Sequence, residues 1–273
     1  MTANAPKIIH ENTLYAEPIF HIGNFPVTNS LLNTWLVVVI IVVFALVLRR
    51  KTRLIPRGLQ NGVEMVFDAF LGIFDSVTGS RAKSIRFAPF IMTFFFFVLL
   101  SNWMGLLPGV GSIGQVVQNG HELFFIPYLR GGTADLNTTL ALAIIGIVVS
   151  HVVGVIFVGS WNYLNKFINF KTLLEIPRKI IKEPTIILVN PIKFFVGLIE
   201  VVGELAKVAS LSFRLFGNVF AGEVLLASMS AILAFGLPLP FMFLEVLVGL
   251  IQALIFSVLV LIYLSTNTTA EEH

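Results

Sequence analysis

Five long apolar segments run through the sequence. They cover about Leu31–Leu48, Phe87–Leu107, Thr138–Gly159, Pro191–Phe235 and Phe241–Leu264. A helix needs roughly 20 mainly apolar residues to cross about 30 Å of hydrocarbon. The pattern therefore predicts an all-α integral membrane protein with five transmembrane helices. The fourth segment is far longer than one perpendicular crossing requires.

A further helical segment, LQNGVEMVFDAFLGIFDSVTG, lies between the first two spans, over residues 59–79. Its acids Glu64, Asp68 and Asp75 are spaced so that they share one helix face. The opposite side is covered by Val66, Phe67, Phe70, Leu71, Ile73 and Phe74. This segment is predicted to be an amphipathic helix lying in the membrane interface. The alternative is a sixth crossing whose polar face is buried in protein.

Positive charge predicts the topology, because Lys and Arg accumulate in the cytoplasmic loops of membrane proteins. One side of the predicted membrane domain holds Arg49, Arg50, Lys51, Arg53, Arg57, Arg81, Lys83, Arg86, Lys166, Lys171, Arg178, Lys179, Lys182 and Lys193. The other side holds only Lys7 and Arg130. The N-terminal tail (residues 1–30) is therefore expected outside the cell and the C-terminal tail (residues 266–273) in the cytoplasm.

Composition supports lipid as the solvent of this chain. Hydrophobic residues make up 56% of the 273 residues and charged residues 12%, about half the charged share of a typical soluble domain. The sequence has no cysteine, which excludes disulfides and thiolate chemistry. The net charge of +3 comes from basic residues that gather on one side of the predicted membrane domain, so it does not indicate a nucleic-acid-binding surface. The first thirty residues lack the pattern of a cleavable signal peptide.

Polar residues interrupt the fourth apolar segment at regular intervals. Five of them fall within an arc of about 80° on a helix and extend over about 27 Å; they are Glu200, Glu204, Lys207, Arg214 and Asn218. Glu223 follows Arg214 by nine positions and therefore lies on the opposite face. For Glu200, Glu204 and Lys207, ordinary ion pairs near the helix end are an equally good interpretation.

Arg214 is the most informative of these residues. An arginine in mid-membrane costs about 2.5–3.5 kcal/mol on insertion scales, so such residues are expected to be buried against protein or to face water, and to be functional. The alternative is a buried ion pair that holds helices together, but no acid lies within one helical turn of Arg214 in the sequence.

The fifth span carries Glu245 and Gln252, which share one helix face. A hairpin centred near residue 233 would place Gln252 level with Arg214 and Glu245 nearly level with Glu223. The prolines at 238 and 240 instead favour a later turn. The two carboxylates are candidate proton-exchange groups. Arginine does not give up its proton and is suited to act as a fixed positive barrier.

Two weaker signals lie near or in the third span. Asp135 and Asn137 flank its start, where N-capping explains them best. His151 is a candidate proton ligand, although a hydrogen-bonded packing histidine is the better interpretation. The sequence contains no Ser/His/Asp set, glycine-rich phosphate loop or metal-ligand cluster, and no cofactor is expected.

The segment SLSFRLFGNVFAGE (Ser210–Glu223), together with LIQALIFSVLVLIYL (Leu250–Leu264), strongly resembles subunit a of F-type ATP synthases. SNWMGLLPG (Ser101–Gly109) and TADLNTTLALA (Thr133–Ala143) support the resemblance, which covers one membrane domain over residues 31–265. It implies a non-catalytic stator subunit of a bacterial inner-membrane complex. The implied partners are a ring of c subunits, the b-subunit peripheral stalk and the rest of the ATP synthase.

The resemblance also implies roles for individual residues. The family's essential arginine falls on Arg214 and its partner glutamine on Gln252, while Asn218, Glu223 and Glu245 match residues of the outer half-channel. Some members have a histidine where Glu245 stands, so the division of acid and base roles between the two glutamates stays open. In the family the last two helices form a strongly tilted hairpin, which agrees with the overlong fourth segment.

The family's cytoplasmic half-channel would run near Glu200, Lys207 and Ser210. The two half-channels would load and release protons on the ring carboxylates, and coupled rotation would drive ATP synthesis elsewhere in the complex. Na⁺ remains an alternative ion, because the rotor site decides which ion binds. Three rival functions are a secondary transporter or channel acting alone, an intramembrane hydrolase, and a structural anchor that would tolerate loss of Arg214.

Overall fold

The computed structural model describes residues 8–9, 13–53, 56–107, 109–119, 122–167, 186–233 and 236–268. Several charged residues of the topology prediction lie outside this part of the chain; they are Lys7, Lys171, Arg178, Lys179 and Lys182. Residues 269–273 of the predicted C-terminal tail also lie outside it. The predicted orientation of the two termini therefore stays a prediction.

Within the described residues, five helices are long and apolar enough to cross a membrane. They are α1 (Asn29–Lys51), α3 (Arg81–Leu106), α4 (Leu136–Val158), α7 (Ile186–Ile232) and α8 (Pro238–Thr268). The prediction of an all-α integral membrane protein with five spans is confirmed, and each helix begins and ends within a few residues of the predicted segment.

Local chemistry explains where two of these helices begin. Thr28 caps α1, and its hydroxyl accepts a hydrogen bond from the Leu31 backbone N–H at 3.3 Å. Asp135 caps α4, and its carboxylate accepts from the Asn137 N–H at 3.2 Å. Such caps satisfy backbone donors that have no partner within the helix. The N-capping interpretation of Asp135 is thus confirmed.

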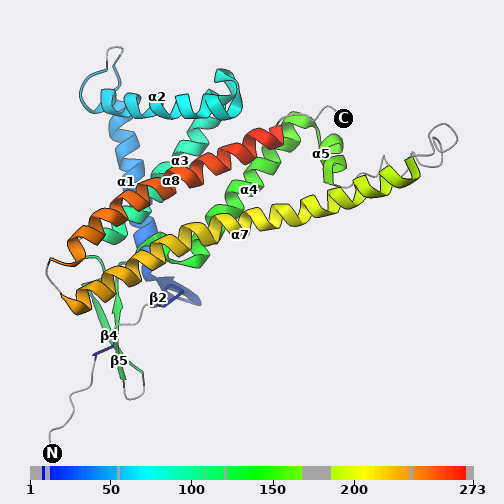
Figure 1. Ribbon diagram of the computed structural model, residues 1–273. Coiled ribbons are helices and arrows are strands. Elements are labelled where there is room, and N and C mark those ends of the chain that lie inside the picture. Colours follow the sequence, from blue (N-terminus) through cyan, green and yellow to red (C-terminus); the bar gives the residue numbers. More distant parts are fainter. Residues whose placement is uncertain are drawn as a thin grey trace, which may run out of the picture.

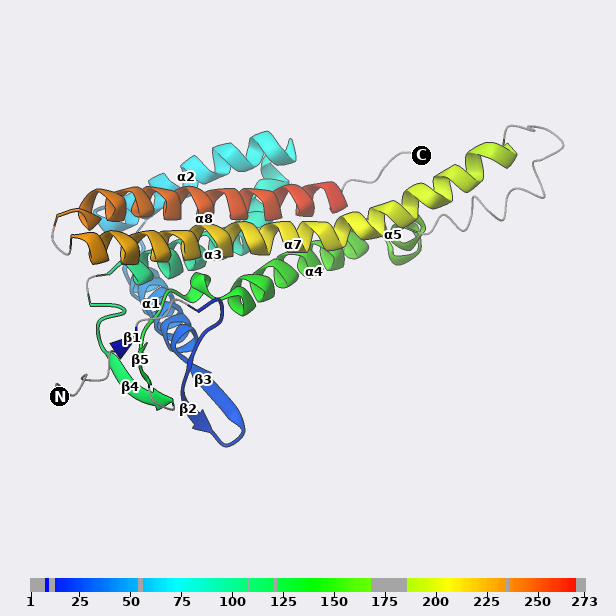
Figure 2. The same cartoon turned by 60° about the horizontal axis from the view of Figure 1, so that its bottom comes forward.

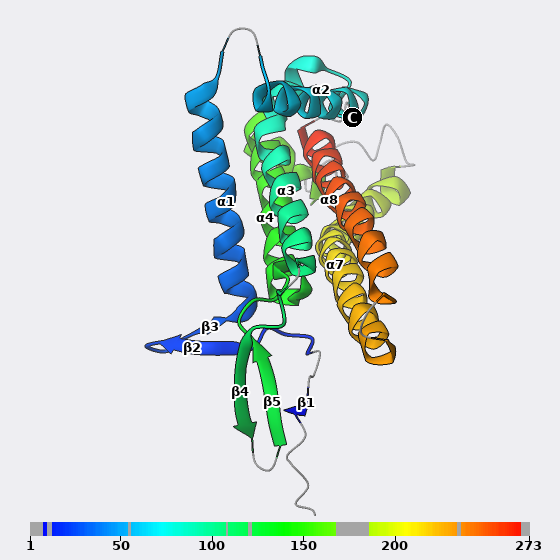
Figure 3. The ribbon, with the colours of Figure 1, turned by 90° about the vertical axis from the view of Figure 1, so that its left-hand side faces the viewer.

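Helix α2 (Leu59–Thr78) lies across one end of the bundle, crosswise to α1 and α3 (Figures 1 and 3). Phe70, Leu71 and Phe74 are buried beneath it, whereas Glu64 and Asp68 are exposed. The helix ends at Gly79, whose positive φ of 64° suits glycine. The prediction of an amphipathic helix outside the spans is therefore confirmed, and the alternative of a sixth crossing is wrong.

The last two helices form a long hairpin and run side by side (Figure 2). Both run obliquely to α1, α3 and α4 in Figure 1, which agrees with the length of the fourth apolar segment. Helix α8 packs on α3, with the rings of Phe94 and Phe256 stacked at 5.7 Å. Gly146 of α4 lets Val260 of α8 approach, because a Cβ there would lie 3.1 Å from the valine.

Strands at the other end of the bundle were not predicted (Figure 3). β2 (Pro18–Ile22) and β3 (Phe25–Thr28) form one antiparallel pair. β4 (Gly114–Asn119) and β5 (Glu122–Pro127) form another, on which the short β1 (Ile8–Ile9) pairs in parallel with β5. We call this the strand end of the bundle and the opposite one the α2 end. Two short helices, η1 (Gly132–Ala134) and α5 (Ser160–Phe167), flank α4.

Candidate functional site

Arg214 lies on an exposed face of α7. Its guanidinium donates a hydrogen bond to the Ser210 hydroxyl, one turn earlier, at 3.2 Å. No carboxylate among the described residues forms an ion pair with Arg214. The alternative of an ion pair that holds helices together therefore finds no support among the described residues. The side chain is left free to face another molecule or water.

Glu223 points to the other side of α7, where it meets Arg130 from the loop before η1. One oxygen of Glu223, Oε2, accepts from Nε of Arg130 at 3.1 Å and from its NH2 group at 3.0 Å. The Arg130 side chain is only 9% exposed, which makes this a largely buried ion pair. The sequence prediction used Arg130 only as a loop charge and missed this contact.

Glu223 and Glu245 line one small cavity at the strand end, and Gln252 contributes to the same wall. The accessible interior is about 40 Å³; because one water needs about 10–15 Å³, it has room for more than one. Seven further residues complete the lining: Asn102, Gly105, Leu106, Val219, Leu226, Val248 and Gly249. Helices α3, α7 and α8 therefore bring both predicted carboxylates and the predicted glutamine together.

The register of the hairpin follows from Gly222. A Cβ built on Gly222 would collide with the carboxylate of Glu245, so Glu245 sits directly against this turn of α7. This agrees with a hairpin centred near residue 233, one of the two registers left open by the sequence. Gln252 lines the cavity alongside Val219 and Glu223, and no hydrogen bond joins it to Arg214 in the described part of the chain.

Asn102 is a member of this site that the sequence prediction did not single out. Its amide nitrogen donates to the Gly249 carbonyl at 3.0 Å, and its amide oxygen accepts from the Thr133 hydroxyl at 2.6 Å. Asn102 thus ties α3 to α8 and to η1 beside the two carboxylates. The SNW motif contained the signal, since a buried asparagine in an apolar span needs polar partners. Asn218, in contrast, does not line the cavity.

A second polar cluster lies toward the α2 end. Glu204 is 9% exposed, and its carboxylate binds the Lys207 amine at 2.7 Å and lies 3.4 Å from Nε2 of His151. The other ring nitrogen of His151 shares a 2.5 Å hydrogen bond with the Tyr163 hydroxyl. The interpretation of His151 as a hydrogen-bonded packing histidine is confirmed, while the role of Glu204 and Tyr163 as its partners was not predicted.

Of the residues predicted to line the cytoplasmic half-channel, Lys207 belongs to this cluster. Lys207 also lies over the ring of Tyr263 from α8, 5.1 Å from its centroid. Ser210 contacts Arg214 instead of Lys207. Burial, followed by the negative charges of Glu204 and Glu200, raises the pKa of Tyr163 to about 12. The phenol therefore stays neutral at physiological pH and keeps its hydroxyl proton.

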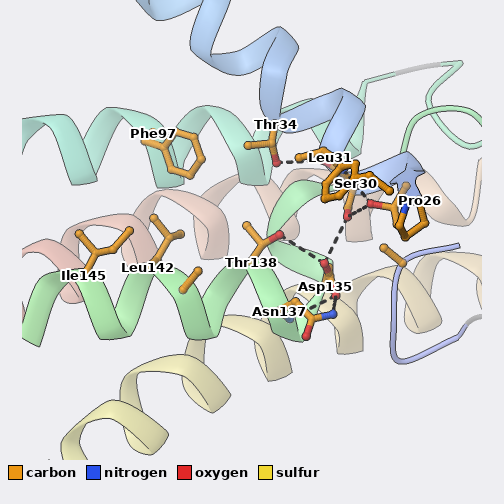
Figure 4. Close-up of a pocket in the computed structure, with 14 residues that line it drawn as sticks. Pro26, Ser30, Leu31, Thr34, Phe97, Asp135, Asn137, Thr138, Leu142 and Ile145 are labelled. Atoms are coloured by element: carbon orange, nitrogen blue, oxygen red, sulfur yellow. Dashed lines mark hydrogen bonds between the residues drawn. The ribbon is translucent and has the colours of Figure 1, made fainter. Parts of the chain in front are cut away.

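A larger cavity lies elsewhere, beside the start of α4, and has a volume of about 540 Å³ (Figure 4). Apolar side chains such as Phe97, Leu142 and Ile145 form most of its wall. Asp135 lies at its polar end, where it accepts from the hydroxyls of Ser30 and Thr138, each at 3.3 Å. In the described part of the chain no group of three His, Cys, Asp or Glu side chains could hold a metal ion.

Comparison with known proteins places this arrangement in a family. Residues 31–265 match the family model described as ATP synthase A chain. The chain is 30% identical to ATP synthase subunit a of Moorella thermoacetica, over 90% of this chain and 94% of the relative. It is 35% identical to the subunit a of Trichlorobacter lovleyi and 33% identical to that of Geobacter sulfurreducens, over 86% of this chain and 85% and 86% of those relatives. The chain therefore belongs to the ATP synthase subunit a family. Its members are multi-pass membrane proteins of the membrane sector of ATP synthase, which takes part in ion transport and ATP synthesis.

Proposed function

We propose that this chain carries protons to and from the carboxylates of a c-subunit ring through two half-channels, with Arg214 as the barrier between them. The observation that carries the proposal is the division of α7 into two faces. Arg214 is exposed and has no acid of its own among the described residues, whereas Glu223 and Glu245 share a cavity on the opposite side.

The entry half-channel is the cavity at the strand end. Two carboxylates and Gln252, with room for water, form a route along which protons can pass from group to group. The family resemblance assigns Asn218, one turn beyond Arg214, to the same half-channel, although it does not line the cavity itself. We place the strand end outside the cell and the α2 end in the cytoplasm, because Arg and Lys gather around α2.

The exit half-channel runs along α7 toward the α2 end, near Glu200, Lys207 and Ser210. Support comes from the polar cluster that Lys207 and Glu204 form with His151. Arg214 lies between the two routes. A fixed cation there favours the ionised form of a rotor carboxylate that passes it and so promotes release of the proton.

This chain contributes no phosphoryl chemistry, because the sequence has no nucleotide-binding motif. The energy arrives as charge movement: one proton crossing 100 mV releases about 2.3 kcal/mol, so several protons are needed for each ATP. ATP is made in another part of the complex. The b-subunit peripheral stalk holds this chain still while the ring turns.

Replacing Arg214 by Gln tests the proposal. In inverted vesicles, the ATP synthase with Arg214→Gln is expected to lose ATP-driven proton pumping, although the complex still assembles. Near-normal coupled pumping would reject the proposal and favour a structural anchor. Rapid ion flux through the purified chain in liposomes, without a ring, would instead favour a channel that acts alone.

A further inference from the structure

Arg130 is held in place by more than its ion pair with Glu223. Its NH2 group donates to the Thr13 carbonyl at 2.8 Å. Its NH1 group donates to the Tyr15 carbonyl at 3.2 Å and to the Thr13 hydroxyl at 3.3 Å. The guanidinium thus joins the chain segment before β2 to the carboxylate on α7.

These additional partners are neutral, and this has a consequence for proton exchange. If Glu223 takes up a proton, its attraction to Arg130 weakens, but the hydrogen bonds to Thr13 and Tyr15 do not depend on that charge. Arginine also stays protonated at any physiological pH. A positive charge therefore remains at the same place beside Glu223 throughout a cycle of protonation and release.

The contacts leave one carboxylate oxygen of Glu223 outside the ion pair. Arg130 binds only Oε2, while Oε1 faces Gly131, where a Cβ would lie 3.3 Å from it. Within the described residues, the charged groups around Glu223 are Arg130 on the loop and Glu245 on α8, and the polar ones are Asn102 and Gln252. Arg130 therefore restrains the carboxylate while one of its oxygens can still exchange a proton.

We propose that Arg130 is a positioning residue for proton uptake at Glu223 and that the segment Thr13–Tyr15 anchors it. The inference rests on the proposed function and adds a residue to its entry half-channel. Arg130 acts through Glu223: it fixes the direction of the carboxylate and makes release of the proton easier. Without this cation, the neutral carboxyl would be favoured and Glu223 would release its proton less readily.

The test uses the whole ATP synthase in liposomes, with the pH on each side set separately. Arg130→Gln removes the charge, and Arg130→Lys keeps it while losing the forked hydrogen bonds. The rate of ATP synthesis per assembled complex is measured against the pH on the strand-end side. We expect the midpoint of this pH profile to move to higher pH in Arg130→Gln and to move less in Arg130→Lys. The dependence on the pH of the opposite side should not change.

Arg81→Ala is the matched control, because it breaks an arginine–carboxylate pair with Asp75 (2.8 Å) at the other end of the molecule. It should leave both pH profiles unchanged. In a Glu223→Gln background, Arg130→Gln should cause no further shift. An unshifted profile in Arg130→Gln, or an equal shift without Glu223, would overturn the inference.

These outcomes are distinct from failure of the proposed function. If Arg214→Gln abolishes coupled pumping while Arg130→Gln leaves the profile unchanged, only the role of Arg130 is rejected. If Arg214→Gln pumps normally, the barrier itself is rejected, whatever the behaviour of Arg130.

Discussion

Arg214 and Glu223 lie nine positions apart on α7 and point to opposite faces of the helix. At about 100° per residue this separation is about two and a half turns, which leaves the two side chains half a turn apart around the helix. Arg214 is exposed and contacts Ser210, whereas Glu223 binds Arg130 and lines a cavity with Glu245. In the proposed mechanism, one helix presents a fixed cation to the ring and keeps the carboxylate that exchanges protons away from that surface.

The two cavity carboxylates lead to a prediction about pH. Glu245→His replaces a group that titrates near pH 4.3 in water with one that titrates near 6.5. We expect the pH dependence of ATP-driven pumping to change in inverted vesicles. Glu64→His, on the exposed face of α2, is the matched control and should leave it unchanged. If the pH dependence of pumping in Glu245→His were the same as in Glu64→His and in the wild type, this would argue against proton exchange at Glu245.

Gly222 leads to a prediction about geometry. A Cβ there would collide with the end of the Glu245 side chain, which is flexible enough to move aside. Gly222→Ala should therefore leave assembly intact and lower the pumping rate, because Glu245 is displaced from the cavity. Gly72→Ala, with nothing within 4 Å of the added methyl group, should pump normally. Equal rates in both variants would mean that the position of Glu245 does not matter.

Tyr163 leads to a prediction about stability at high pH. Burial and the nearby glutamates raise its pKa from 10.0 to about 12, so the folded state disfavours the phenolate. The stabilisation is fully present below pH 10 and is lost as the pH rises toward about 12. Between these values, the melting temperature of the purified wild-type chain in detergent should fall more steeply than that of Tyr163→Phe. If the melting temperatures of the two proteins fell equally with pH, a raised pKa of Tyr163 would be contradicted.

Much of the architecture could be predicted from the sequence, because lipid imposes a simple rule on it. A spanning helix must be long and apolar, so the five spans follow from the lengths of the apolar segments. The tilt of the last two helices was implied only by the family resemblance. The crosswise position of α2 follows equally from its three acids on one face. The small sheets were missed because strands of two to six residues leave only a weak pattern in loop sequence.

The site was predictable where it depends on helix periodicity and not where it depends on distant contacts. The opposite faces of Arg214 and Glu223 follow from spacing within one helix. The pairing of Glu223 with Arg130 joins residues 93 positions apart, and nothing local in the sequence indicates it. The contact of Asn102 with Gly249 spans 147 positions in the same way. The sequence left open whether Arg214 is buried against protein or faces water, because the cost of a charge in lipid is relieved in either case.

The barrier role of Arg214 is the central claim, and proton-driven ATP synthesis by the Arg214→Ala enzyme tests it most directly. The measurement compares equal amounts of assembled complex in liposomes under the same imposed pH difference, with Arg81→Ala as the control. The account predicts that Arg81→Ala makes ATP at the wild-type rate and that Arg214→Ala makes none above background. Synthesis by Arg214→Ala at a rate near that of the wild type would contradict it.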